Sequence, residues 1–142
     1  MSAPWPLSVY IVTLNCATWL EDTLESVREA AEVVILDSGS TDGTRAIAER
    51  FPNVRISHQD WLGYSAQKAL ALAMCSQPWA LNLDGDEELT PELADEILET
   101  ITEGRVDALE TPICDVFMGL VPHTLTKRHA KVRCFRRMKG SY

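Results

Sequence analysis

The 142-residue sequence contains no apolar run that approaches the ~20 residues of a membrane-spanning helix. Its N-terminus lacks a basic stretch followed by an apolar one, so we expect no signal peptide there. The four cysteines are widely scattered without a Cys-x-x-Cys pair, and the three histidines show no ligand spacing, which disfavours a zinc site. These absences favour a cytoplasmic protein with free thiols over a membrane-spanning, secreted or zinc-dependent one.

Basic residues are scarce over most of the chain, and the formal net charge is −8. Residues 127–142 nevertheless hold seven of the 13 Lys and Arg residues and none of the 21 acidic ones. The acidic body argues against nucleic-acid binding. For the basic end two interpretations stay open: an edge strand with one solvated face, or contact with phosphates or with the anionic inner face of a membrane.

The hydrophobic pattern alternates between the periods of strands and helices. With 46% hydrophobic and 24% charged residues, we expect one globular domain over residues 1–142. Helices are predicted at about 19–28, from a cap at Ser40 or Thr41 to about 50, at 65–74 and at 91–101. Strands are predicted at 7–14, 32–36, 54–57, 79–83, 106–113 and, at an edge, 131–138. This order predicts an α/β fold with a mostly parallel central sheet flanked by helices.

Polar side chains stand at the ends of three predicted strands. Thr13 and Asn15 end the first, Asp37 ends the second, and Asp84 and Asp86 follow the fourth. Ligands of such sheets bind beyond the carboxyl ends of the strands, so these positions predict a nucleotide-type site. The chain lacks the Gly-x-Gly-x-x-Gly fingerprint and the Walker A sequence, which disfavours dinucleotide-binding and P-loop classes.

The Asp84-Gly85-Asp86 stretch is the candidate metal site. If the backbone there is extended, the two carboxylates point to the same side and converge. One or two carboxylates together with substrate phosphates are typical of Mg²⁺ sites. Gly85 would then let a ligand approach the backbone. The alternative is an acidic turn that leads into the helix at Pro91.

Four other side chains have two interpretations each. Asp37 either accepts hydrogen bonds from a base or ribose, or caps a helix. Lys68 either faces a phosphate from an otherwise apolar helix, or lies at the surface with its stem packed. Trp61 and Tyr64 either stack on a base or sugar, or pack within the protein.

Several motifs occur in an informative order. They are Val-Ile-Leu-Asp-Ser-Gly-Ser-Thr-Asp-Gly-Thr at 34–44, Asp-Trp-Leu-Gly at 60–63, Gln67-Lys68 and Leu-Asp-Gly-Asp-Glu at 83–87. In these motifs the sequence resembles the family 2 glycosyltransferases, and more narrowly their bacterial lipopolysaccharide-core branch. The resemblance covers residues 7–104 well and continues more loosely through Gly119 and 132–137.

This resemblance implies a GT-A fold, in which a Rossmann-like sheet binds a nucleotide-diphosphate sugar and Mg²⁺ or Mn²⁺. By motif position, Thr13 and Asn15 would line the nucleotide pocket, and Asp37 would contact the base. Asp84 would approach the ribose or the metal. Asp86 would be the catalytic metal ligand, holding the cation that stabilises the leaving nucleoside diphosphate. Relatives invert the anomeric centre by direct attack of a hydroxyl from a glycan or lipid-linked acceptor, which requires a general base.

The sequence departs from the family pattern at three places. Ala69 replaces an Asn, Gly85 replaces an Ala, and the chain ends at Tyr142 where relatives continue. Residues 105–142 are therefore expected to form only part of the acceptor side. Asp115 lies in that half but matches no family motif, so no general base is assigned.

Three alternatives to an active glycosyltransferase stay open. The first is a catalytically silent nucleotide-sugar-binding or scaffold domain, and the second is a homodimer that covers exposed sheet. A phosphatase with an Asp-x-Asp nucleophile is disfavoured, because Glu88 stands where that class has Thr or Val and the motif follows three earlier strands.

Overall fold

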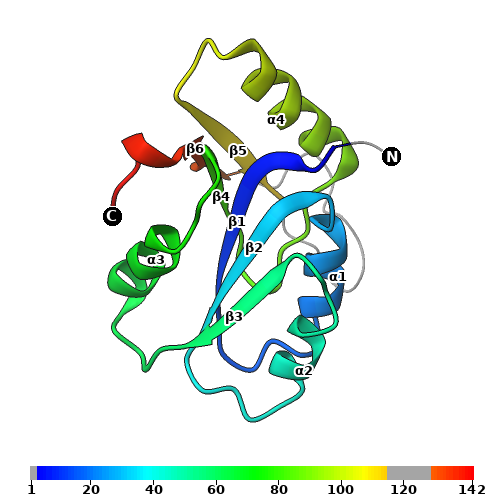
Figure 1. Ribbon diagram of the computed structural model, residues 1–142, viewed down its shortest axis with the longest axis vertical. Helices are drawn as coiled ribbons and strands as arrows, with labels where there is room; N and C mark the ends of the chain where they lie inside the picture. The colour runs from blue at the N-terminus through cyan, green and yellow to red at the C-terminus, as the bar shows by residue number, and fades with distance from the viewer. Residues whose placement is uncertain (1–2, 115–128) are drawn as a thin grey trace.

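A six-stranded sheet forms the centre of the protein in the computed structural model, which describes residues 3–114 and 129–142 (Figure 1). Its strands are β1 (Trp5–Thr13), β2 (Ala30–Asp37), β3 (Val54–His58), β4 (Trp79–Asn82), β5 (Ala108–Ile113) and β6 (His129–Arg136). The spatial order is β3-β2-β1-β4-β6-β5. The first four strands are mutually parallel, and β6 runs antiparallel to both β4 and β5. Asp115 and Gly119 lie outside the described residues.

Helices cover both faces of this sheet. They are α1 (Leu20–Ser26), α2 (Thr44–Ala48), α3 (Tyr64–Ala73), α4 (Pro91–Glu103) and a short 3₁₀ helix, η1 (Arg137–Lys139). Figure 1 shows α3 on one side and α1 and α2 on the other. The mixed α/β fold with a mostly parallel sheet is thus confirmed. In residues 3–114 and 129–142, none of the helices has both the length and the apolarity to cross a membrane.

Strand β1 is mostly apolar, and most of it is buried on both faces. Leu7, Val9 and Ile11 pack into the core beneath α1, α2 and α4. Tyr10 and Val12 point the other way, into the core beneath α3. Successive side chains of a strand alternate between faces, so burial on both sides removes the polar half of the usual pattern.

Helix α4 has the ends that its sequence predicts. The Thr90 side chain accepts a hydrogen bond from the Leu93 amide at 3.2 Å, and Pro91 occupies the first turn. Gly104 ends the helix in the left-handed region, at φ +67°.

The predicted caps of α2 are wrong. Its N-cap is Gly43, and Asp42 Oδ1 accepts hydrogen bonds from the Thr44 amide at 2.9 Å and the Thr44 hydroxyl at 2.5 Å. Ser40 and Thr41 lie too early, because their polar groups bond to the strand-end residues described below. The helix therefore begins later than expected.

The prediction of an edge position for the last strand is also wrong. Strand β6 lies between β4 and β5, and β5 is the edge. Cys134 is buried in β6, opposite Leu81 and Leu109. The alternating arginines suggest a solvated edge in the sequence, but Arg133 and Arg136 pair with acidic residues of the protein.

Candidate functional site

Asp37, at the end of β2, organises the loop that follows it. Oδ1 accepts hydrogen bonds from the hydroxyls of Thr13 (2.7 Å) and Ser40 (2.5 Å), and Oδ2 accepts them from the amides of Gly39 (3.0 Å) and Ser40 (2.8 Å). Gly39 has φ +106°, a conformation that favours glycine. Burial by itself would raise the pKa of Asp37, which is 5% exposed, but these hydrogen bonds outweigh it and lower that pKa. The carboxylate thus shapes the loop as an anion.

Asn15 clamps the same loop from the end of β1. It adopts φ +53°, which asparagine tolerates better than most residues. Its Oδ1 accepts hydrogen bonds from the amides of Thr41 (2.9 Å) and Asp42 (3.4 Å), and its own amide donates to Ser40 Oγ at 2.8 Å. Thr13, Asn15 and Asp37 therefore belong to one network at the carboxyl ends of β1 and β2.

A cluster of four charged side chains lies beyond β4. Lys68, from α3, donates to Asn82 Oδ1 at 3.0 Å and to Asp84 Oδ1 at 3.3 Å. Arg133, from β6, lies 3.8 Å from Asp84 Oδ2 and donates two hydrogen bonds to Glu87, at 2.9 and 3.1 Å. The two cations and two carboxylates balance, so the cluster is formally neutral.

A turn, not an extended strand, places the acidic residues. The Glu87 amide donates to the Asp84 carbonyl at 3.1 Å, and the Asp84 amide donates to Glu87 Oε2 at 2.9 Å. The expectation of extended backbone at 84–86 is therefore wrong, because β4 ends at Asn82. Asp84 is half-exposed within the charged cluster. Asp86 is exposed and makes no hydrogen bond or ion pair with the part of the chain that the structure describes.

Packing inside the protein gives a reason for glycine at position 85. A Cβ at this buried residue would lie 2.8 Å from Cys16 Sγ and 3.2 Å from Cys16 Cβ. The Gly85 carbonyl accepts a hydrogen bond from Thr23 Oγ1 at 3.2 Å. The close approach to Cys16 thus joins the loop after β1 to the turn after β4, and the approach of a ligand to Gly85 stays a prediction.

Gln67 was not singled out by residue chemistry, yet it is fully buried (0% exposed). Its Nε2 donates to Ser38 Oγ at 3.2 Å and to the Gln59 carbonyl at 3.1 Å, and its Oε1 accepts from the Leu62 amide at 3.2 Å. The side chain thus ties the loops after β2 and β3 together. The signal in the sequence was an uncharged polar residue on an apolar helix.

The sequence places Arg133 in the basic end, but in the structure it lies in the charged cluster. It is 8% exposed, and a buried guanidinium requires paired carboxylates. Its place between apolar residues in 132–135 indicates burial. The sequence does not reveal its partner, because Glu87 lies 46 residues earlier in the chain.

A model of the family described as Glycosyl transferase family 2 matches residues 8–140. The chain belongs to this family. It is 38% identical, over 151 aligned positions, to the lipopolysaccharide core biosynthesis glycosyltransferase LpsC of Rhizobium meliloti, covering 96% of this chain and 53% of that protein. It is 44% identical over 92 residues to an uncharacterized glycosyltransferase of Rickettsia conorii, covering 64% of this chain and 32% of that protein. The chain thus spans about half or less of these relatives.

Solved structures show the same architecture. Staphylococcus aureus TarS 1–349 in complex with UDP-GlcNAc superposes with a TM-score of 0.64 at 25% identity, covering 72% of this chain and 32% of that one. The mannosyltransferase PcManGT of Pyrobaculum calidifontis, in complex with GDP-Man and Mn²⁺, gives a TM-score of 0.61 at 23% identity, covering 75% and 36%. The fold of this family 2 domain is the Rossmann-like GT-A fold.

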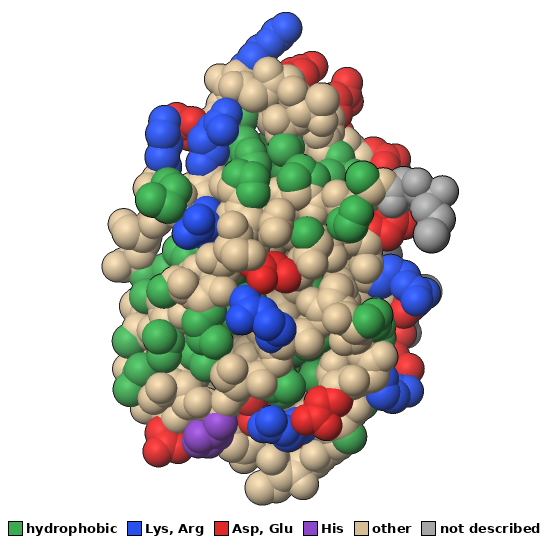
Figure 2. Space-filling view, viewed as in Figure 1, with side chains coloured by type: hydrophobic (Ala, Val, Ile, Leu, Met, Phe, Trp, Pro, Cys, Tyr) green, Lys and Arg blue, Asp and Glu red, His purple; other side chains and the backbone are tan. Residues whose placement is uncertain are grey.

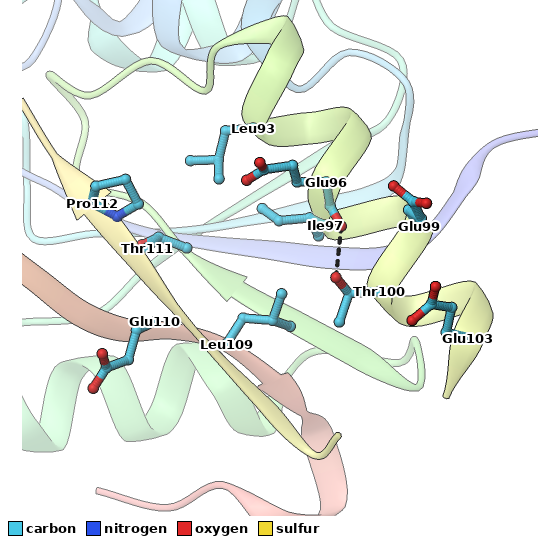
Figure 3. A pocket seen from close by; sticks show the side chains of 10 residues that line it. All are labelled: Leu93, Glu96, Ile97, Glu99, Thr100, Glu103, Leu109, Glu110, Thr111 and Pro112. Carbon is cyan, nitrogen blue, oxygen red and sulfur yellow. Dashed lines mark hydrogen bonds between the residues drawn. The ribbon is translucent and has the colours of Figure 1, made fainter. Parts of the chain in front are cut away.

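A cavity of about 360 Å³ lies elsewhere, between α4 and β5 (Figure 3). Figure 3 shows Glu96, Glu99 and Glu103 along the helix and Glu110 on the strand. None of the predicted site residues lines it. The residues expected to bind the donor are those at the carboxyl ends of the parallel strands instead.

The basic end of this family 2 domain is partly neutralised. Arg136 and Lys139 both pair with Asp107, at 2.8 and 2.7 Å, and Arg137 donates to the Gln77 carbonyl at 2.9 Å. On the face drawn in Figure 2, basic side chains are interspersed with acidic ones. These contacts give the basic residues structural roles.

Proposed function

We propose that this domain binds a nucleotide-diphosphate sugar with Mg²⁺ or Mn²⁺ and transfers the sugar, with inversion, to a glycan or lipid-linked acceptor of the lipopolysaccharide core. The observation that carries the proposal is the charged cluster of Lys68, Asp84, Glu87 and Arg133 beside the loop organised by Asp37. The cluster lies beyond the carboxyl end of β4, and open α/β sheets bind their ligands beyond such strand ends, which supports the proposal. The similarity to LpsC supports the lipopolysaccharide core as the acceptor class.

The carboxylates of Asp84 and Asp86 fit a hard divalent cation. Among residues 3–114 and 129–142, no group of three or more His, Cys, Asp or Glu side chains is arranged to hold a metal by itself. Mg²⁺ is often held by one or two carboxylates together with substrate phosphates, and Asp86 pairs with none of the cations in the described part of the chain. The cation, when bound, would neutralise charge that develops on the leaving diphosphate.

Thr13 and Asn15 shape the nucleotide pocket, and Lys68 contacts the diphosphate. The contact between Asp37 and the base stays a prediction, and its four internal hydrogen bonds favour a role in shaping the loop. We propose that residues 105–142 form part of the acceptor side within a single domain.

The binding test uses the purified chain titrated with UDP and with GDP in the presence of Mn²⁺. We expect Asp86→Asn to weaken nucleotide affinity roughly 10- to 100-fold, because it removes a charged ligand. Asp95→Asn is the matched control, since Asp95 is exposed on α4 away from the strand ends. Absence of binding by the wild type, or equal affinities in wild type and Asp86→Asn, would overturn the site.

A catalytically silent nucleotide-sugar-binding or scaffold domain is the alternative function. It predicts the same nucleotide binding without sugar transfer or donor hydrolysis. Steady release of UDP from UDP-GlcNAc, abolished by Asp86→Asn, would exclude it. Three further points stay predictions: a cytoplasmic location, contact with the inner face of a membrane, and a homodimer. Light scattering of the purified chain tests the homodimer.

A further inference from the structure

Asp84, a proposed metal ligand, is already paired with two cations of the protein. Lys68 Nζ lies 3.3 Å from its Oδ1, and Arg133 lies 3.8 Å from its Oδ2. The Lys68 side chain is 22% exposed and is also held by Asn82 Oδ1 at 3.0 Å. A divalent cation at Asp84 therefore meets two positive charges beside the carboxylate, and one of its two oxygens already accepts a hydrogen bond from Lys68.

The two cations differ in how firmly they are held. Arg133 is buried and makes two hydrogen bonds to Glu87, a planar arrangement that fixes its guanidinium. Lys68 reaches Asp84 through a flexible four-carbon stem and a single long hydrogen bond. Lys68 is thus the cation that can move away from Asp84 while Arg133 keeps the turn in place.

Neither the cation nor the diphosphate, binding alone, fits this arrangement of charges well. A bare cation at Asp84 is repelled by Lys68 and Arg133, and if it displaces Lys68 it leaves the ammonium without its carboxylate. A bare diphosphate meets the unpaired Asp86 carboxylate and a lysine that is already neutralised. When both arrive, the cation takes Asp84 and the lysine takes a phosphate, so every charge keeps a partner.

We propose that Lys68 exchanges partners, from Asp84 to the donor diphosphate, and thereby couples cation binding to nucleotide binding. This inference rests on the proposed function, because it assumes that a nucleoside diphosphate and a cation share the cluster. Coupling of this kind is reciprocal: each ligand raises the affinity of the other by the same factor.

The test compares wild type with Lys68→Met, which keeps the length of the side chain and removes its charge. Free Mn²⁺ is followed by electron paramagnetic resonance, and UDP and GDP are titrated by calorimetry with and without Mn²⁺. For Mn²⁺ alone we expect Lys68→Met to bind about 2- to 5-fold more tightly, the range of one partly exposed ion pair. For nucleotide in saturating Mn²⁺ we expect roughly 10-fold or more weakening.

Partner exchange predicts that Lys68→Met binds Mn²⁺ more tightly and nucleotide more weakly. If Lys68 had only a structural role, its loss would weaken the binding of both ligands. Lys139→Met is the matched control, because it also removes a lysine paired with a carboxylate, here Asp107, and it should change neither affinity. Unchanged or weaker Mn²⁺ binding by Lys68→Met overturns the exchange, even if nucleotide affinity falls. If Mn²⁺ binds more tightly but no nucleotide binds to the wild type, the proposed function fails and so does the coupling, although the competition at Asp84 is then shown.

Discussion

Cys16 and Gly85 set the distance between the loop after β1 and the acidic turn after β4. Gly85→Ala would place a Cβ 2.8 Å from Cys16 Sγ, with Thr13 also within 3.6 Å, so the turn must shift. We expect a loss of about 1–3 kcal/mol in the free energy of unfolding, the usual cost of overpacking. Urea unfolding measures it, and nucleotide affinity should fall because Asp84 and Asp86 flank the glycine.

The double variant Cys16→Ala/Gly85→Ala is the control for this contact. Removal of the sulfur should restore much of the lost stability, so the two substitutions should be strongly non-additive. Additive effects would show that the close approach is not the cause.

Single residues show what a sequence can and cannot reveal about this site. The positions of Thr13, Asn15, Asp37 and Asp84 at or just beyond strand ends follow from hydrophobic periodicity. The four hydrogen bonds to Asp37 do not, because they depend on the φ of Gly39. The role of Arg133 was equally hidden, since its burial depends on where β6 joins the sheet.

At the scale of elements, Glu32 joins strands at the end of the sheet opposite the site. Its carboxylate accepts hydrogen bonds from Ser8 of β1 at 2.5 Å, Arg55 of β3 at 3.0 Å, and the amide (2.5 Å) and hydroxyl (2.9 Å) of Ser76 before β4. Burial alone would raise the pKa of Glu32, but these bonds lower it to about 2. One side chain thus connects four consecutive segments of the parallel sheet.

The variant Glu32→Gln tests this connection. A carboxyl group with a lowered pKa in the folded protein stabilises it above the unfolded pKa, and the contribution is lost as the pH falls from about 4.5 toward about 2. We expect Glu32→Gln to lose roughly 1–3 kcal/mol at pH 7 by urea unfolding, and the difference from wild type to shrink across that window. Glu29→Gln, at an exposed position, should match the wild type. A difference that stays constant between pH 7 and pH 2.5 would contradict the assignment.

Elements were easier to predict than their neighbours in space. In residues 3–114 and 129–142, the strand and helix periods predict the four α-helices and the six strands to within a few residues, but not the short helix η1. The edge position of β6 was wrong because alternating charge looks alike whether it faces water or, as with Arg133 and Arg136, acidic side chains of the same chain. The spatial order of strands in a sheet depends on such long-range pairs, and the hydrophobic period of the sequence carries no information about them.

For the whole molecule, the charge asymmetry of the sequence leads to a test of membrane contact. Lys131 is exposed, while Lys139 shares Asp107 with Arg136. We expect sedimentation with phosphatidylserine-containing vesicles at low salt and little at physiological salt, because exposed charges are screened over about 8 Å. Each lysine near an anionic surface contributes about 1 kcal/mol, so Lys131→Ser/Lys139→Ser should weaken partitioning roughly 30-fold.

Neutral phosphatidylcholine vesicles serve as the control, together with Arg28→Ser/Arg45→Ser, which removes two exposed cations from other parts of the surface. If both double variants weaken partitioning equally, the attraction comes from overall charge and not from the basic end. No sedimentation with anionic vesicles at low salt would leave Arg136, Arg137 and Lys139 only their contacts with Asp107 and Gln77. In that case an acceptor held in a membrane must be reached through other parts of the protein surface.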